Sequence, residues 1–422
     1  MKVLFLTNEY PPRVYGGAGV HVDYLSRELC ALMDIRVFAF GRHDGSPACP
    51  WVTGFELDPS RFKCPPHLQS VFGAIARCLD FNTTYIDPDI AVVHCHTWYS
   101  HFGGILAKLI YGTPMVLTVH SLEPLRPWKR EQLGGGYDFS SWVERTAIEM
   151  ADAVIAVSRE TKTDVLRLFN VREDRVHVIH NGIDPNEFRW VPEHDALEKF
   201  GINPDVPYVL FVGRVTRQKG IVHLVRAIRH MDLGFQVVIV GGAPDTPEIE
   251  AEMKQAIEQV RRHRDGVFWI DHISRKDILL QLYSHAAVFC CPSIYEPFGI
   301  INLEAMACET PVVASAVGGI KEVVVHGETG YLVPVKQQDR APFEPVDPER
   351  FSADLAARIN ELMARPDLRE RFGRAGRQRV VDHFSWRAIA EQTKALYEQV
   401  ARPAPQADEE RTLSVGASPE RG

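Results

Sequence analysis

The sequence predicts an α/β protein in which two Rossmann-like domains face each other across a central cleft. Short apolar runs without polar alternation recur along the chain, as in parallel strands covered on both faces. Helix-like runs separate them, so strand and helix alternate. The series stops near residue 190 and then restarts, which predicts two such units within the 422 residues.

The first series predicts an N-terminal domain at residues 1–190. Its elements are, in order, "KVLFLT" (2–7), "GVHVDYLSRELCAL" (19–32), "IAVVHCH" (90–96), "HFGGILAKLIY" (101–111), "PMVLTVH" (114–120), "DAVIAVS" (152–158) and "VHVIHNGI" (176–183). Because strands of this kind end at a common edge, a ligand is expected in the cleft at their carboxyl ends.

The second series predicts a C-terminal domain at residues 191–384. The break is "FRWVPEHDALEKFGINPDVP" (188–207), which is rich in proline and charge. The elements that follow are "PYVLFVG" (207–213), "VHLVRAIRHM" (222–231), "QVVIVGG" (236–242), "VFWIDHI" (267–273), "AAVFCCPS" (286–293) and "PVVASAV" (311–317). A last helix, expected at 385–401, should pack back on the N-terminal domain. The tail 402–422 is rich in Pro, Ser, Gly and charge, and is expected to be disordered.

The composition excludes several classes of partner. The net charge is −8 and neither sign forms long blocks, which argues against a nucleic-acid surface. No apolar run approaches the length of a membrane span, and the short run at the start does not fit a signal peptide. The eight cysteines show no C-x-x-C spacing, which fits reduced thiols. We therefore expect a cytoplasmic protein without a nucleic-acid or membrane partner, and leave a homo-oligomer open.

A glycine-rich loop follows the first strand. Gly16, Gly17 and Gly19 would let the backbone approach a ligand closely, and the next helix N-terminus would favour an anion. The alternative is a tight strand–helix turn. The loop is not G-x-G-x-x-G and no acidic residue ends the next strand, which argues against a dinucleotide cofactor.

Two further segments suggest a site in the second domain. In "FVGRVTRQKG" (211–220), Arg214, Arg217 and Lys219 crowd one loop at a strand end, where cations are well placed to bind a pyrophosphate. The alternative is a solvated loop. In "SIYEPFGIINLEAMACETP" (293–311), Glu296 and Glu304 flank an apolar segment. A buried carboxylate is costly unless it is hydrogen-bonded, so both acids need partners.

In the first domain, His120 ends a strand and a cationic loop follows. That loop carries Arg126, Trp128, Lys129 and Arg130. The pair in "HCHTW" (94–98) has no third or fourth ligand at suitable spacing, so no metal is expected there. The "DPD" at 87–89 is expected to be a turn rather than a metal motif.

Taken together, these motifs resemble a known family. "GGAGVH", "VHSLEPLRPWK", "HNGID", "GRVTRQKG", "EPFGIINLE" and "VGGIKEVV" occur in the order seen in retaining glycosyltransferases of the GT-B fold. The likeness covers roughly residues 1–400. It is strongest to the actinobacterial-type glycogen synthases and α-maltose-1-phosphate synthases, which use ADP-glucose. It implies a hexosyltransferase of glycogen or α-glucan biosynthesis, an ADP-glucose-dependent α-1,4-glucosyltransferase.

The resemblance also implies residue roles. Glu304 would bind the donor ribose and Glu296 the hydroxyls of the donor sugar. Arg214 and Lys219 would hold the pyrophosphate and stabilise the leaving ADP. His120 would lie against the donor sugar near its anomeric carbon. Backbone N–H groups would meet sugar and phosphate, from Phe298, Gly299, Ile300 and Ile301 and from the Gly16–Gly17 loop. Front-face attack would need no enzyme nucleophile, no metal and no cofactor.

The sequence departs from the related starch synthases in one loop. Their K-x-G-G lysine is absent, and Arg13-Val14-Tyr15 precedes the glycines instead. The two acids are both kept, which favours the broader GT-B group.

The acceptor stays open between an α-glucan end and glucose 1-phosphate. Three cations at Arg126, Lys129 and Arg130 suit a sugar phosphate better than a neutral glucan. The alternative is that they pair with nearby acids such as Glu123 and Glu131, while Trp128 could stack on either acceptor. A sugar-nucleotide epimerase or a non-catalytic module of the same fold are the competing functions. ADP- versus UDP-glucose preference and the role of residues 336–351 stay open.

Overall fold

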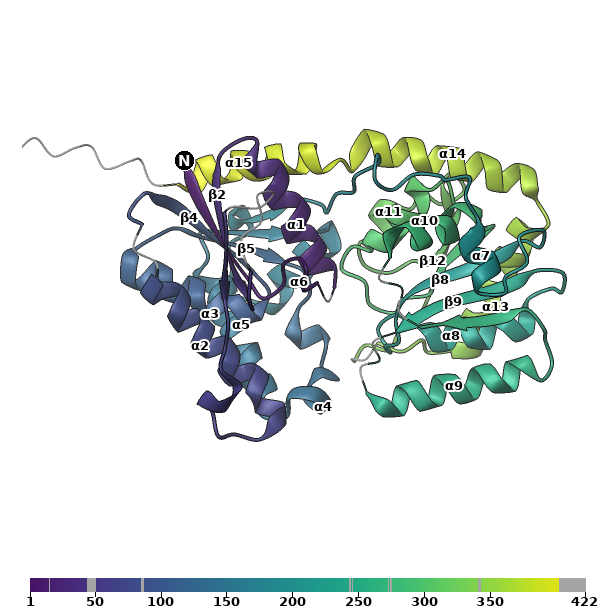
Figure 1. Ribbon diagram of the computed structural model, residues 1–422, viewed down its shortest axis with the longest axis horizontal. Helices are drawn as coiled ribbons and strands as arrows, with labels where there is room; N and C mark the ends of the chain where they lie inside the picture. The colour runs from purple at the N-terminus through teal and green to yellow at the C-terminus, as the bar shows by residue number, and fades with distance from the viewer. Residues whose placement is uncertain are drawn as a thin grey trace, which may run out of the picture.

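The computed structural model describes residues 1–401 except 15, 44–50, 85–86, 243, 245, 272, 274 and 341–342. The tail expected at 402–422 lies outside the described residues. Two parallel sheets, each covered by helices, form two lobes that lie side by side (Figure 1). The α/β class predicted from the sequence is therefore confirmed.

The N-terminal lobe is built on a seven-stranded sheet with the order β3-β2-β1-β4-β5-β6-β7. The strands are β1 (Lys2–Thr7), β2 (Asp34–Phe40), β3 (Val52–Phe55), β4 (Ile90–His96), β5 (Met115–Val119), β6 (Ala153–Ala156) and β7 (Val176–Val178). Every residue of β5 and β6 is buried, which explains why these runs show no polar alternation. Strands β2 and β3, which the sequence reading had not identified, add one edge of the sheet.

Helices cover both faces of this sheet (Figure 1), with α2, α3 and α5 on one face and α1 on the other. The helices are α1 (Gly17–Cys30), α2 (Gln69–Thr84), α3 (Trp98–Leu106), the π-helical η3 (Ala107–Tyr111), α4 (Lys129–Leu133), α5 (Gly136–Met150) and α6 (Arg159–Leu168). Single 3-10 turns are η1 (Pro59–Arg61), η2 (Pro66–Leu68), η4 (Glu123–Leu125) and η5 (Glu173–Arg175). The cap of α6 is Ser158, whose side chain accepts a hydrogen bond from the Thr161 N–H.

The C-terminal lobe has a six-stranded parallel sheet with the order β10-β9-β8-β11-β12-β13. Its strands are β8 (Tyr208–Arg214), β9 (Gln236–Gly242), β10 (Val267–Ile270), β11 (Val288–Cys291), β12 (Val312–Ser315) and β13 (Gly330–Val333). Its helices are α7 (Asp195–Lys199), α8 (Ile221–Ala227), η6 (Ile228–His230), α9 (Pro247–Arg261), α10 (Lys276–His285), α11 (Ile300–Ala307), α12 (Ile320–Val323), α13 (Pro348–Met363) and α14 (Pro366–His383). In Figure 1, α8, α9 and α13 cover one face of this sheet and α10, α11 and α14 the other.

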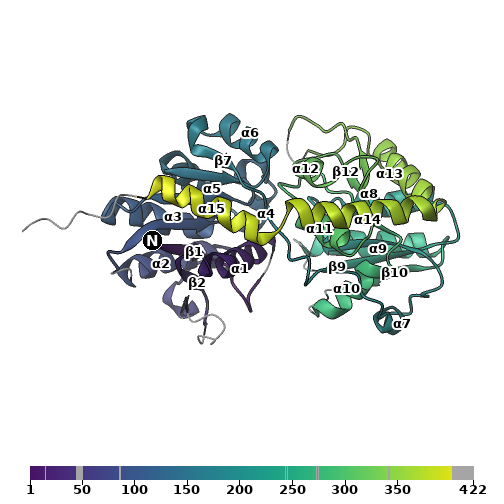
Figure 2. The same ribbon diagram turned by 90° about the horizontal axis from the view of Figure 1, so that it is seen from above.

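The last helix, α15 (Trp386–Val400), returns to the N-terminal lobe and packs beside α1. Trp386 stacks on Tyr24 of α1 with ring centroids 5.7 Å apart, and the Tyr397 hydroxyl lies 2.6 Å from Nδ1 of His94 in β4. Figure 2 shows α14 and α15 running in succession over the two lobes. The chain thus crosses between the lobes twice, and the crossings touch where the Ile183 N–H donates to the Phe384 carbonyl at 2.7 Å.

Strand order places the functional loops. In each sheet the order of strands reverses between the first strand and a later one, at β1/β4 and at β8/β11. Ligands of such sheets bind at this switch point, outside the carboxyl ends of the strands. The glycine loop follows β1, and Arg214 ends β8. The loop that carries Glu296 follows β11. The candidate groups of both lobes therefore belong to the two switch points.

Candidate active site

The loop after β11 holds Glu296 in a nearly closed environment. Its side chain is 9% exposed, and Oε2 lies 2.6 Å from Lys219 Nζ. The Ser293 hydroxyl donates to the same oxygen at 3.3 Å. The loop packs tightly on Gly318, where φ is +50° and an added Cβ would lie 1.9 Å from the Glu296 carbonyl oxygen. A side chain at position 318 would therefore displace the backbone of Glu296.

The loop after β8 lies directly against the Glu296 loop. The Ile294 N–H donates to the Gln218 carbonyl at 3.0 Å. Gly220 has a φ of +64°, and an added Cβ there would lie 1.9 Å from the Pro292 carbonyl oxygen. This close approach brings Lys219 to Glu296, while Arg214 sits half-buried at the end of β8. Two motifs that are 77 residues apart in the sequence thus share one ion pair.

Glu304 lies on α11 and is held by a residue that sequence reasoning missed. The Tyr283 hydroxyl, from α10, donates to Glu304 Oε2 at 2.9 Å. Burial raises the pKa of Glu304, and the hydrogen bond from Tyr283 opposes that rise. The helix begins after Gly299, which has a φ of +95°. No sequence signal marks Tyr283, because its position relative to α11 depends on how α10 packs.

The glycine loop of the N-terminal lobe reaches across to α11. An added Cβ on Gly17 would lie 3.6 Å from Cδ1 of Ile300. The Gly16 N–H donates to Oε2 of Glu9 at 2.9 Å. Ile301 is half-buried in the first turn of α11, and Phe298, just before that helix, is buried. The two helix N-termini that were assigned to phosphate binding therefore face each other from opposite lobes.

His120 belongs to a group of three imidazoles, here called the histidine cluster, made by His21, His96 and His120. His96 ends β4 and its Nδ1 lies 3.2 Å from His120 Nε2, because β4 and β5 are neighbours in the sheet. His21 of α1 packs edge-on to His120 with ring centroids 4.7 Å apart, and its Nδ1 lies 2.7 Å from the Asn181 Oδ1 acceptor. Only His120 is partly exposed.

Burial keeps the histidine cluster neutral near pH 7. Desolvation lowers the pKa of His21 to about 4 and the pKa values of His96 and His120 well below 6.5. Each residue offers one nitrogen, and these atoms lie within 4.8 Å of one another, so the donor set would suit a transition-metal ion. The sequence alone places His94 beside His96 on one strand face and predicts no metal at that pair. His94 is engaged by the Tyr397 and Thr118 hydroxyls, at 2.6 and 2.7 Å.

Asp87 is part of a surface turn, as its sequence context predicts. Its side chain accepts from the Asp89 N–H at 3.0 Å and pairs with Lys2 at 2.6 Å. The turn leads directly into β4, and these contacts occupy both oxygens of the Asp87 carboxylate.

Two buried acids, Glu123 and Glu144, support the cationic loop after His120. Arg126 donates to the Ser121 hydroxyl at 2.8 Å and lies 3.8 Å from the Glu123 carboxylate. Glu144 of α5 accepts from the Glu123 N–H at 2.8 Å, and burial beside Glu123 raises the pKa of Glu144 well above 4.5. Arg126 therefore has Glu123 as a neighbour, as the alternative interpretation supposed.

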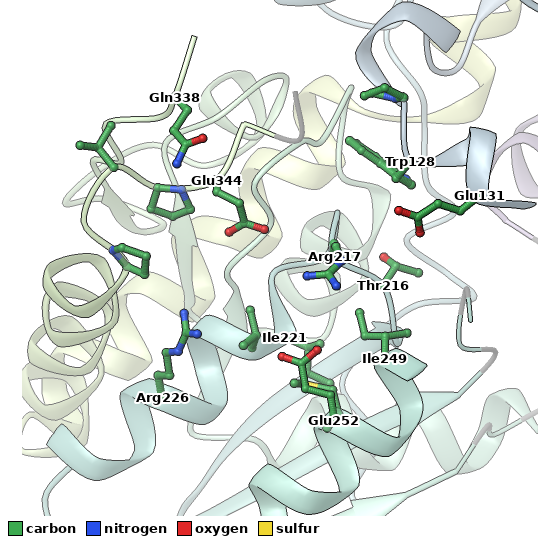
Figure 3. Close-up of a pocket in the computed structure, with 16 residues that line it drawn as sticks. Trp128, Glu131, Thr216, Arg217, Ile221, Arg226, Ile249, Glu252, Gln338 and Glu344 are labelled. Atoms are coloured by element: carbon green, nitrogen blue, oxygen red, sulfur yellow. The ribbon is translucent and has the colours of Figure 1, made fainter. Parts of the chain in front are cut away.

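The other residues of this loop have separate surroundings. Arg130 pairs with Asp138 at 3.0 Å rather than with Glu131, and its guanidinium covers the Tyr137 ring. Lys129 is half-buried at the start of α4. Trp128 lines a cavity of about 620 Å³ that opens between the lobes (Figure 3). Of the residues assigned to the acceptor, Arg126, Trp128 and Arg130 thus have different surroundings.

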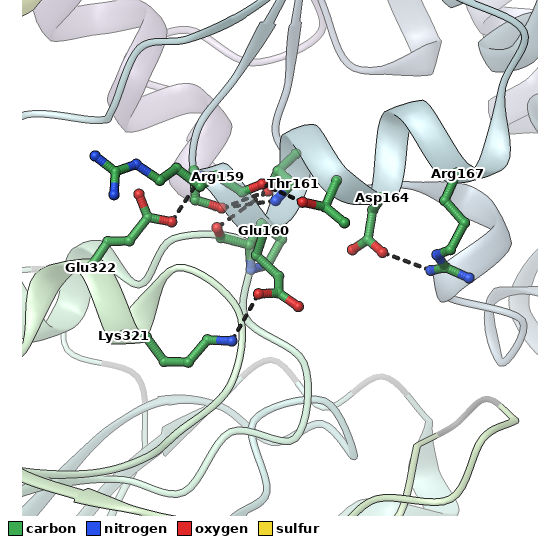
Figure 4. Close-up of polar contacts among 10 residues, drawn as sticks. Arg159, Glu160, Thr161, Asp164, Arg167, Lys321 and Glu322 are labelled. Carbon is green, nitrogen blue, oxygen red and sulfur yellow. Dashed lines mark hydrogen bonds and ion pairs between the residues drawn. The ribbon is translucent and has the colours of Figure 1, made fainter. Parts of the chain in front are cut away.

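Polar contacts join the lobes next to the Glu296 loop (Figure 4). Glu322 of α12 accepts from the Arg159 N–H at 2.8 Å, and Lys321 pairs with Glu160 at 2.8 Å. These contacts seat α12 on the N-terminal turn of α6. The Tyr295 hydroxyl also receives the Leu122 N–H at 3.3 Å, which ties the Glu296 loop to the strand end of His120.

Among the described residues, no helix is long and apolar enough to cross a membrane.

Comparison with known proteins agrees with this geometry. Residues 15–187 match the model of "Glycosyltransferase Family 4" and residues 193–342 that of "Glycosyl transferases group 1". The chain is 47% identical to an alpha-maltose-1-phosphate synthase of Mycolicibacterium smegmatis, over 95% of this chain and 100% of that protein. It is 28% identical to a glycogen synthase of Mycobacterium tuberculosis, over 100% of both chains.

A solved structure shows the same architecture. Sucrose-phosphate synthase from Thermosynechococcus elongatus superposes with a TM-score of 0.76 at 27% identity, covering 94% of this chain and 99% of that one. The sheets, the facing switch points and these likenesses together show the GT-B fold. The chain is an enzyme of the glycosyltransferase class and belongs to the family that contains the alpha-maltose-1-phosphate synthases.

Proposed function

We propose that the protein is a retaining glucosyltransferase that moves glucose from ADP-glucose to glucose 1-phosphate, which makes α-maltose 1-phosphate. The observation that carries the acceptor assignment is the place of Arg126. Its guanidinium lies 2.8 Å from the hydroxyl of Ser121, the residue directly after His120. Its Nε has no hydrogen-bond partner within the described residues, so donor capacity is left for a phosphate. The name of the Mycolicibacterium relative supports the same product.

The donor would bind on the C-terminal side of the cleft. Glu304, already hydrogen-bonded to Tyr283, has a second oxygen for the ribose diol. The α11 N-terminus and the glycine loop would offer N–H groups to the phosphates. Arg214 and Lys219 would bind the pyrophosphate. No metal ion is required in this scheme, because two cationic side chains and two helix N-termini supply the positive charge.

The ion pair between Lys219 and Glu296 suggests an exchange on donor binding. Without ligand, the pair neutralises a carboxylate that would otherwise repel a phosphate. With donor bound, Lys219 would turn to the phosphate and Glu296 would accept a hydrogen bond from a hydroxyl of the donor sugar. Each group keeps a partner throughout, so neither charge is left buried alone.

In the chemical step the bond between the anomeric carbon and the leaving phosphate oxygen breaks. The acceptor hydroxyl oxygen bonds to the same face of that carbon, and its proton passes to the departing ADP. Negative charge grows on the phosphate, where Lys219 and Arg214 would stabilise it more in the transition state than in the ground state. His120 is neutral, so it would hydrogen-bond a sugar hydroxyl without adding charge to an oxocarbenium-like centre.

The experiment that tests this proposal offers labelled ADP-glucose and UDP-glucose with glucose 1-phosphate, glycogen and maltooligosaccharides in turn. We expect maltose 1-phosphate from ADP-glucose, with an α-anomeric signal by NMR. Turnover with glycogen alone would assign a glycogen-elongating synthase, and an epimerised nucleotide sugar would assign an epimerase. Binding without turnover would leave only a binding module.

One substitution tests the acceptor assignment separately from the donor assignment. Arg126→Ala should raise KM for glucose 1-phosphate about tenfold and leave KM for ADP-glucose nearly unchanged, because one charge-assisted hydrogen bond is lost. Arg145→Ala is the matched control, since Arg145 lies on the exposed side of α5 and pairs with Glu149 at 3.3 Å. Equal effects of both substitutions would remove Arg126 from the acceptor site.

A further inference from the structure

The 620 Å³ cavity between the lobes lies outside the donor site. Pro127, Trp128 and Glu131 form its wall on the N-terminal lobe. The remaining wall comes from the loop after β8, from α8 and α9, and from Gln338, Glu344, Pro345, Val346 and Pro348 of the C-terminal lobe. None of Glu296, Glu304 or Lys219 lines it. Its size falls in the range of small-molecule sites, about 300–1,000 Å³.

The cavity shares a loop with the donor site but lies on the other side of it. Thr216 and Arg217 line the cavity, whereas Lys219, two residues further on, points to Glu296. The Thr216 hydroxyl accepts from the Lys219 N–H at 3.2 Å, so the two sides of the loop are joined. A ligand in the cavity would therefore lie close to the reacting groups without displacing the donor.

Of the charged groups that face the cavity, Glu344 lies 3.3 Å from His223, and the other four have no ion-pair partner among the described residues. These four are Arg217, Arg226, Glu131 and Glu252. Arg226 is half-buried on α8, where an unpaired guanidinium is costly unless a ligand or water satisfies it. Figure 3 shows these side chains directed into the same space from different elements. A group of charged side chains of both signs, without ion-pair partners and around one cavity, suggests a polar ligand.

The balance of charge indicates that the ligand is neutral. Two guanidinium groups face three carboxylates, those of Glu131, Glu252 and Glu344. A phosphate dianion would meet net repulsion, while a sugar hydroxyl can donate to a carboxylate and accept from a guanidinium. Trp128 adds an aromatic ring, and Ile249 and Val346 add apolar contact for the C–H faces of sugar rings. This combination suits an oligosaccharide.

We propose that this cavity binds several glucose units of a neutral α-glucan chain, at a site separate from the donor site. The chemical class rests on the proposed function, because that function supplies α-linked glucose as the sugar. The structure of the cavity supplies the rest: its volume, its unpaired charges of both signs and its tryptophan.

The test uses the full chain and maltoheptaose as the probe, with no donor present. Calorimetry and saturation-transfer NMR would measure binding to the parent protein, to Arg226→Ala and to Glu252→Ala. We expect each substitution to raise Kd about tenfold, the effect of one lost hydrogen bond to a charged group. Thermal denaturation would check that both variants fold.

The matched controls lie on η6, which continues α8, and on α9. Arg229→Ala follows α8 and removes an exposed side chain that pairs with Glu349 at 3.7 Å. Glu258→Ala removes one on α9 that pairs with Arg261 at 2.9 Å. Neither control residue lines the cavity, so both should bind maltoheptaose within twofold of the parent.

Three results would overturn the inference. The first is no binding of maltoheptaose by the parent protein at millimolar concentration, and the second is equal effects of the site and control substitutions. The third is a rise in KM for glucose 1-phosphate in Arg226→Ala while its binding of maltoheptaose stays unchanged, which would make the cavity a phosphate site. Failure of the proposed function looks different: maltoheptaose would still bind and respond to Arg226→Ala, while no maltose 1-phosphate would form.

Discussion

Replacing Lys219 by methionine should destabilise the protein as well as slow it. The Lys219 and Glu296 side chains are 16% and 9% exposed and their charged atoms are 2.6 Å apart. Removing one partner of a buried pair leaves the other charge without compensation, at about 3–5 kcal/mol. The Ser293 hydroxyl still donates to Glu296, so we place the loss in free energy of unfolding at the low end, about 3 kcal/mol.

The assay is urea denaturation of Lys219→Met, Glu296→Gln and the double variant. In the double variant no buried carboxylate remains, so about 2 kcal/mol of the loss should be recovered. Lys254→Met is the control, because Lys254 and Glu250 are 2.7 Å apart but 58% and 39% exposed. Breaking that surface pair should cost about 0.5 kcal/mol or less.

Among these three variants, kcat should not change in parallel with the free energy of unfolding. The double variant regains stability but still lacks the cation at the leaving phosphate, so its kcat should stay as low as that of Lys219→Met. Lys219→Met should also lower kcat more than it raises KM for ADP-glucose. Unchanged stability in Lys219→Met, or a double variant no more stable than the single one, would refute the view that the pair is a buried charge pair.

Three further outcomes are expected. Glu304→Ala should weaken ADP-glucose binding by about 2 kcal/mol in calorimetry, and an unchanged affinity would remove the ribose assignment. Burial raises the pKa of Glu144, so the folded chain holds that proton more tightly and the free energy of unfolding falls as pH rises through the raised pKa. In Glu144→Gln that slope should be absent, which makes the variant the more stable protein near about pH 8 but not near about pH 4 in denaturation curves. Activity should survive exhaustive EDTA treatment. A loss restored by Zn²⁺ would give the histidine cluster a role as a required metal site, whereas a loss restored by Mg²⁺ or Mn²⁺ would point to oxygen ligands elsewhere.

Most buried strands could be predicted from the sequence, but β2 and β3 of the first sheet could not. The fully buried strands β5 and β11 appear as plain apolar runs. Strand β2 alternates buried and exposed residues, and β3 has only four residues, one of them glycine. Helices α13 and α14 also escaped prediction, because they are rich in charge and lie beyond the apolar series. Their positions depend on packing, not on local pattern.

In the site, the motif residues could be predicted but their partners could not. Glu296 and Lys219 are conspicuous because charge stands next to apolar runs. That they pair follows only from β8 and β11 being neighbours in the sheet. Tyr283 carries no local signal, and His21 appears in the sequence only as the last residue of the motif "GGAGVH"; each reaches the site from the side of a helix. Long-range contacts of this kind need the strand order, which a single sequence does not state.

The return of α15 to the first lobe also matters for how the chain folds during synthesis. The apolar face of α1 and the His94 ring are covered only when Trp386 and Tyr397 have been synthesised. These two residues lie about 200 residues after the last strand of that lobe. At about 5–20 residues per second, the ribosome needs about 10–40 s to deliver them. During that interval the surface of the N-terminal lobe that α15 later covers is exposed to solvent. Its final stability is therefore set only after the whole C-terminal lobe has emerged, so the N-terminal lobe cannot be completed from a contiguous piece of the chain.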